Sequence, residues 1–90
     1  MKENNNNVEL GEVTREIAAE RFRLFPLVIL PVGACEQHGP HLPLDTDAFD
    51  AHYLAVQGAL KAQAPKPLVL PTLPFGVSFH HLSFSGTISI

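Results

Sequence analysis

Hydrophobic and polar positions change their spacing several times along the chain. Residues 13–23 place apolar side chains at helical spacing between charged ones, which predicts an amphipathic helix that stops before Pro26. Residues 27–32 form a continuous apolar run, a pattern typical of a strand buried on both faces. Residues 48–63 carry alanines every three or four positions, which predicts a helix packed closely on a sheet. Residues 68–70 predict a second buried strand.

This order of strand, loop, helix and strand predicts a βαβ unit with parallel strands and a right-handed crossover. Either Thr46 or Asp45 can cap the N-terminus of the helix, and Asp47 in its first turn suits the helix dipole. Residues 1–10 are predicted to be a disordered polar leader. Residues 11–90 are predicted to be a truncated part of a single α/β domain, because the alternating sequence at 88–90 reads as a strand at which the chain stops.

Charge and composition narrow the choice of partners. The formal charge is -3 and Lys and Arg form no cluster, so neither nucleic acid nor an anionic membrane is expected as a partner. The longest apolar run, residues 24–32, is too short to span a bilayer, and the N-terminus has no apolar signal core. We therefore expect a cytoplasmic protein. A single cysteine, Cys35, excludes an intramolecular disulfide framework.

Residues 36–47 form the stretch richest in candidate metal ligands. Glu36 and His38 are two positions apart, so an extended backbone directs both side chains to one side. Asp47 follows after a turn, at the start of the predicted helix. Oxygen and nitrogen ligands without thiolate suit Zn²⁺, Mn²⁺ or Co²⁺ in a catalytic site. From spacing alone, a polar loop that caps a helix explains these residues equally well.

Neighbouring residues carry weaker signals. Cys35 should point away from Glu36 and pack as a small apolar side chain. His41 is a candidate further ligand or a partner of one, although a surface histidine is the commoner case in such a loop. Ser78 is either a candidate substrate hydrogen-bonder or a turn residue. At most one of the adjacent His80 and His81 should face the site if the backbone there is extended.

Two motifs resemble the signatures of the creatininase (creatinine amidohydrolase) family. Residues 30–47 read LPVGACEQHGPHLPLDTD and resemble its first motif, and residues 76–90 read GVSFHHLSFSGTISI and resemble its second. The second motif departs from the usual family pattern at His80, where Glu is common, and at Ser85, where Pro is usual. In the first, Asp45 stands where Gly is usual. The resemblance covers residues 13–90 and implies that residues 11–90 are the N-terminal part of the predicted α/β domain.

The resemblance implies a three-layer αβα fold with a mostly parallel sheet, of which this chain carries the first βαβ portion. It also implies two divalent metal ions, zinc or manganese, with Glu36 on one, His38 on the other and Asp47 bridging both. A hydroxide at this centre would hydrolyse a small-molecule amide, most plausibly a cyclic one such as creatinine. Formamide-type compounds and modified peptides are the alternatives. The family assembles as a hexamer, and His81 is the histidine that matches its second motif.

Three ligands shared between two metals leave each metal with an incomplete shell, and the Gly-His-Gly-Gly-Asn-like segment typical of the family has no counterpart before Ile90. We therefore expect activity if the chain is part of a longer protein. A noncatalytic fragment or assembly module is the alternative. A simple metal-binding or nucleotide-binding βαβ protein ranks last, because Asp45 and Asp47 would repel phosphate.

Overall fold

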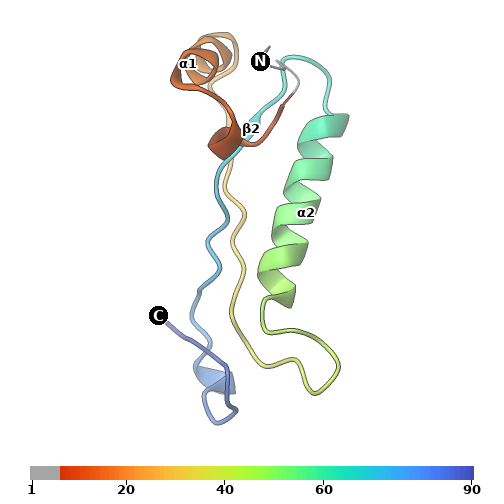
Figure 1. Cartoon of the computed structure of the whole chain (residues 1–90), viewed down its shortest axis with the longest axis vertical. Coiled ribbons are helices and arrows are strands. Elements are labelled where there is room, and N and C mark those ends of the chain that lie inside the picture. The colour runs from red at the N-terminus through yellow and green to blue at the C-terminus, as the bar shows by residue number, and fades with distance from the viewer. Residues whose placement is uncertain (1–6) are drawn as a thin grey trace. The chain divides into compact units, whose positions relative to one another are not determined.

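The structure, a computed structural model, describes residues 7–90. Its elements are η1 (Leu10–Glu12), α1 (Arg15–Leu24), β1 (Val28–Ile29), α2 (Thr46–Lys61), β2 (Leu68–Val69) and η2 (Phe79–His81) (Figure 1). They divide into two compact units, one made of Met1–Leu30 and Leu54–Pro71 and the other of Pro31–Tyr53 and Thr72–Ile90. Within the described residues, no helix has both the length and the apolar character needed to cross a membrane.

In the first unit, β1 and β2 are parallel, with Val28 opposite Leu68 and Ile29 opposite Val69. A backbone hydrogen bond of 2.8 Å from Leu70 N–H to the Ile29 carbonyl continues the ladder. Since α2 lies between the two strands in sequence, the predicted βαβ order is confirmed. The fold class is therefore α/β, built on a small parallel two-stranded sheet with helices.

The core of this unit brings α2 against the sheet and the start of the chain. Val8, Ala59 and Val69 are each no more than 2% exposed, and Ile29, Ala55 and Val56 pack against them. The alanine spacing of the helix therefore serves close packing, as the sequence predicts. Val8 was expected within a disordered leader, but it is buried and its neighbour Glu9 bridges to Val69. The predicted leader thus fails for residues 7–10, while residues 1–6 lie outside the described part.

The first strand differs from its prediction. Residues 27–32 were expected to be buried on both faces, but β1 spans only Val28–Ile29 and Val28 is 40% exposed. The reason is that, among residues 7–90, β1 pairs with one strand, whereas β2 is fully buried because it contacts both β1 and the segment around Glu9. An apolar run indicates that a strand is suited to burial on both faces. It does not identify the residues that pack against each face.

Helix α1 begins two residues later than the periodicity predicts. The Thr14 hydroxyl accepts a 3.3 Å hydrogen bond from Ile17 N–H and so caps the helix. Arg21 is buried at 9% exposure and donates hydrogen bonds to the carbonyls of Asn7, at 2.6 Å, and Lys66, at 3.1 Å. The Arg21 guanidinium therefore links α1 to the segment that precedes it and to the segment that leads into β2.

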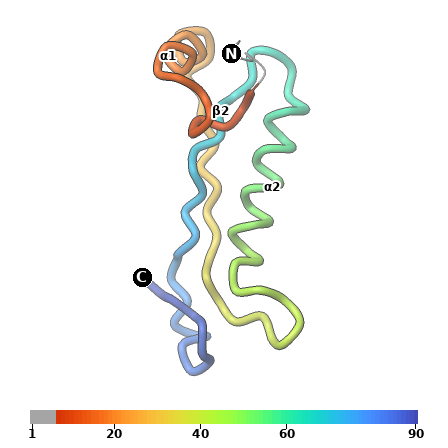
Figure 2. Tube along the Cα trace, viewed as in Figure 1, coloured from red at the N-terminus to blue at the C-terminus, as the bar shows by residue number. Residues whose placement is uncertain are grey.

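In the second unit, the segments that follow β1 and β2 run side by side (Figure 2). Val32 bridges in parallel to Leu73, supported by hydrogen bonds from Gly33 N–H to the Leu73 carbonyl, at 2.8 Å, and from Leu73 N–H to the Pro31 carbonyl, at 3.0 Å. The chain end then returns to this pair, because Ile88 bridges to Cys35 and Ser89 to Gly76. Both candidate loops are thereby held next to one another.

The start of α2 fits tightly against the first of these segments. The Asp45 carbonyl accepts from Phe49 N–H at 2.8 Å, so Asp45 rather than Thr46 stands at the helix cap. A Cβ on Gly33 would lie only 2.3 Å from the Ala48 Cα, which means that only glycine fits at this crossing. This close contact fixes where the first turn of α2, with Asp47 in it, meets the loop.

Candidate metal centre

The first loop is held by backbone hydrogen bonds at several points. Glu36 N–H donates to the Leu44 carbonyl at 3.2 Å, which folds the loop back on itself. Gln37 N–H donates to the Thr87 hydroxyl at 3.0 Å, and Gln37 Oε1 accepts from Gly39 N–H at 3.0 Å. Gly39 has a φ of 71°, a value that favours glycine. These contacts fix the backbone that carries Glu36 and His38.

Glu36, His38 and Asp47, which we call the inner group, offer three ligand atoms within 4.8 Å of one another. His38 Nε2 lies 3.5 Å from Asp47 Oδ2, and the Asp47 carboxylate comes from the first turn of α2. His38 Nε2 is buried and has no hydrogen-bond partner, since its contact with Asp47 falls outside hydrogen-bond geometry. The structure therefore brings together the three residues that the sequence singled out.

Glu36 is the less exposed carboxylate of this group, with its side chain 12% accessible against 41% for Asp47. The pKa of Glu36 is lowered from its ordinary value, chiefly by the Ser78 hydroxyl, with further lowering by Asp47, His81 and His80 and an opposing effect of burial. Ser78 is fully buried, but its hydroxyl makes no hydrogen bond of ordinary geometry. The Ser78 hydroxyl is a neighbouring donor that can rotate toward the Glu36 carboxylate. The Glu36 carboxyl remains ionised at neutral pH.

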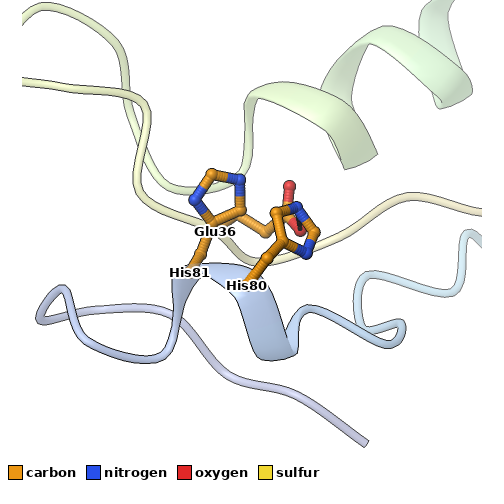
Figure 3. Close-up of side chains that lie close together, drawn as sticks. All are labelled: Glu36, His80 and His81. Carbon is orange, nitrogen blue, oxygen red and sulfur yellow. Dashed lines mark ion pairs between the residues drawn. The ribbon is translucent and has the colours of Figure 1, made fainter.

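The second loop presents two histidines to the same carboxylate. Glu36, His80 and His81, which we call the outer group, also offer ligand atoms within 4.8 Å of one another (Figure 3). The expectation that at most one histidine faces the site is wrong, because the backbone here is the 3-10 helix η2 and not an extended segment. Successive side chains of such a helix are about 120° apart, so neighbours can converge on one point.

The remaining candidates lie elsewhere. His41 is exposed and belongs to neither group among the described residues, and the same is true of Asp45. The Cys35 thiol lies 3.5 Å from the Gly86 carbonyl and also stands outside both groups. His80 is the residue that sequence reasoning passed over. Its signal, a pair of adjacent histidines, becomes informative only when the turn geometry is known.

The inner group suits a divalent cation by its chemistry. It combines two carboxylates with an imidazole, the oxygen and nitrogen donors that Zn²⁺ and Mn²⁺ accept. The buried, unpartnered His38 Nε2 supports this fit, because a buried polar atom without a partner is costly and a metal bond would satisfy it. Only Asp47 is positioned by a helix, while Glu36 and His38 depend on the loop contacts described above.

Comparisons with known proteins agree with this picture. A family model described as creatinine amidohydrolase matches residues 11–90. The mycofactocin precursor peptide peptidase of Mycobacterium ulcerans (strain Agy99) is 39% identical over 87 residues, which is 90% of this chain and 35% of that protein. Two solved creatininase structures, one described as a manganese form and one as a Zn-Zn type mutant, are each 30% identical, with TM-scores of 0.84 and 0.83.

Each of these structures covers 93% of this chain, while the match takes up 34% of the solved chain. The chain therefore spans about a third of the length of the relatives it matches. Its helices and parallel strands correspond to the N-terminal portion of their α/β fold. With a family model that covers 80 of its 90 residues, from 11 to 90, this chain belongs to the creatininase family.

Proposed function

We propose that this protein acts in the metal-dependent hydrolysis of an amide C–N bond, with the inner group as ligands of a binuclear centre. The observation that carries the proposal is the convergence of Glu36, His38 and Asp47 within 4.8 Å, with His38 Nε2 buried and unpartnered. Descriptions of related structures as Zn-Zn and manganese forms support zinc or manganese as the cation.

Each residue of the inner group has a distinct part in this proposal. By the family resemblance, Glu36 would hold one cation, His38 would hold the other, and Asp47, carried by the first turn of α2, would be shared by both. Divalent cations held in this way polarise an amide carbonyl and make a water molecule a stronger nucleophile. The lowered pKa of Glu36 keeps it in the anionic form that ligation requires. Ser78, buried beside Glu36, can donate a hydrogen bond to that carboxylate and so orient it.

Two substrate classes remain as proposals. A small cyclic amide of the creatinine type follows from the similarity to creatininases. An amide bond of a peptide follows from the similarity to the mycofactocin precursor peptide peptidase, which is higher in sequence identity, at 39% against 29–32% for the solved creatininase structures. The peptide alternative is thus at least as well supported as creatinine.

We also propose that the protein self-associates. Several large apolar side chains of the described residues are exposed, including Leu54 at 69%, Val77 at 68% and Phe79 at 65%. Exposed apolar surface of this kind is commonly covered by another chain or another part of the protein. A homo-oligomer, a hexamer if the family resemblance extends that far, would provide such cover.

The test is a comparison of metal content and hydrolysis between the wild-type protein and His38→Ala. After incubation with Zn²⁺ or Mn²⁺ and dialysis, elemental analysis should show less bound metal in His38→Ala, and hydrolysis of creatinine or of a short peptide amide should be lost. His41→Ala removes an exposed imidazole of the same loop and should leave the metal content unchanged. Equal metal content and equal turnover in His38→Ala and wild type would refute the proposal.

A further inference from the structure

We propose that Glu36, His80 and His81 form a second divalent-cation site, which lies at the outer group and goes beyond the hydrolytic centre proposed above. The two groups have only Glu36 in common. The outer site therefore needs its own cation ligands from η2, and its existence does not depend on whether the inner group catalyses hydrolysis.

The distances within the outer group suit a single cation. Zinc bonds of about 2.0–2.1 Å place ligand atoms about 3.3 Å apart in a tetrahedron and about 4.2 Å apart across an octahedron. His80 Nε2 lies 3.9 Å from Glu36 Oε2, about 0.6 Å more than the tetrahedral separation, so a small rotation of the exposed His80 ring brings the pair onto one cation. The centroids of the His80 and His81 rings are 4.1 Å apart, and their planes are tilted by 48°. Both rings rise from η2 toward the Glu36 carboxylate (Figure 3).

The chemistry of the group favours a transition-metal ion or zinc. Two imidazoles and one carboxylate leave positions open for water, and this donor set binds zinc in catalytic sites and ferrous iron in oxygenases. A carboxylate and two imidazoles are weaker ligands for Mg²⁺ and Ca²⁺, which prefer oxygen throughout. The outer site should therefore select Zn²⁺ or Co²⁺ over Mg²⁺.

The two histidines are held to different degrees. His81 Nδ1 lies 3.0 Å from Gln37 Nε2, and because Gln37 Oε1 already accepts from Gly39 N–H, the amide nitrogen is the group that faces the ring. Gln37 therefore donates to His81 Nδ1 and holds the ring in place. A cation that binds through Nδ1 takes over this position from the amide.

His80 is the more accessible ligand. Its side chain is 69% exposed, compared with 24% for His38, so it can rotate toward a cation without displacing packed neighbours. A cation at the outer group would consequently be reached more readily from solvent than one at the inner group.

The experiment measures zinc binding by the whole chain with and without His80. His80→Ala should bind one equivalent of Zn²⁺ fewer, or bind its last equivalent about tenfold or more weakly, when titrated by calorimetry. The matched control is Phe79→Ala, which removes an exposed ring without ligand atoms from the same turn. Phe79→Ala should titrate like the wild type. Identical titrations of His80→Ala and Phe79→Ala would overturn the proposal.

A second measurement separates this site from the inner one. In a His38→Ala background, Zn²⁺ should still shift the ring ¹⁵N resonances of His80 and His81, assigned by their loss in single alanine variants. Mg²⁺ at the same concentration should not shift them. Absence of a Zn²⁺ shift in that background would also overturn the outer site. The proposed hydrolytic function would not be affected by that result, because its own test is the metal content and turnover that depend on His38.

Discussion

The contact between Gly33 and the start of α2 allows a sharp test of how the fold positions Asp47. An added Cβ at Gly33 would lie 2.3 Å from the Ala48 Cα, 2.5 Å from its nitrogen and 2.9 Å from its Cβ. Two of these three atoms belong to the backbone, so the overlap cannot be relieved by rotating a side chain. Gly33→Ala must therefore push the first turn of α2 away from the loop.

The chain offers a matched control in Gly58→Ala. Both substitutions add one methyl group, and both restrict the unfolded chain to a similar extent, so that the unfolded-state contribution cancels between them. Gly58 lies within α2, and nothing stands within 4 Å of its added Cβ. In a helix interior, alanine should raise the free energy of unfolding by about 0.5–1 kcal/mol. Overpacking at Gly33 should lower it by about 1–3 kcal/mol.

The assay is urea unfolding followed by circular dichroism, with zinc titration of the same samples. With a urea dependence of about 1–1.5 kcal/mol/M for a small protein, a loss of about 1–3 kcal/mol lowers the midpoint for Gly33→Ala by about 0.7–3 M relative to wild type. Because Asp47 precedes Ala48 directly, the zinc affinity of Gly33→Ala should also fall, while that of Gly58→Ala should not. A Gly33→Ala protein as stable and as zinc-competent as the wild type would refute the proposed positioning.

Two further predictions concern the inner group. Asp47→Asn should prevent binuclear loading of the inner group, because an amide cannot replace a bridging carboxylate. Elemental analysis should find at least one equivalent of metal fewer than in the wild type, and an unchanged metal content would contradict the bridging role. Ser78→Ala should raise the pKa of Glu36, followed by carboxyl ¹³C shifts, because the hydroxyl is the main cause of its lowering. A depressed carboxyl pKa stabilises the folded state at neutral pH, and this contribution is lost as pH falls through the folded pKa. The stability of Ser78→Ala should therefore vary less with pH in that acidic window, and an unchanged Glu36 pKa would contradict this.

Patterns that depend on neighbours along the chain were predictable. The alanine spacing of residues 48–63 indicated a helix packed on a sheet, and the structure places Ala55 and Ala59 in that contact. The motif at Glu36, His38 and Asp47 indicated a cluster, and their side chains do converge. In both cases the expected local backbone geometry, helical or extended, relates the spacing of residues in sequence to the directions of their side chains.

Features that depend on tertiary contacts were not predictable. Val8 lies in a polar leader by composition, yet it fills a place beside Ala59 and Val69 that the two-stranded sheet leaves open. The exposure of β1 was not predicted, because a run of apolar residues does not indicate which chain segment will pack against it. The position of Val8 is therefore a property of the assembled core and not of its own segment.

The two ligand groups illustrate the same division at the site. The two-residue spacing of Glu36 and His38 predicted that both side chains point to one side, whereas the convergence of His80 and His81 depends on the 120° step of η2. Glu36 links them, so any substitution of Glu36 would weaken both groups and could not tell them apart. Substitutions that separate the two groups must fall on ligands that belong to one group alone, and His38 and His80 meet that condition. Because His38 comes from the first loop and His80 from η2, loss of one imidazole leaves the backbone that carries the other intact.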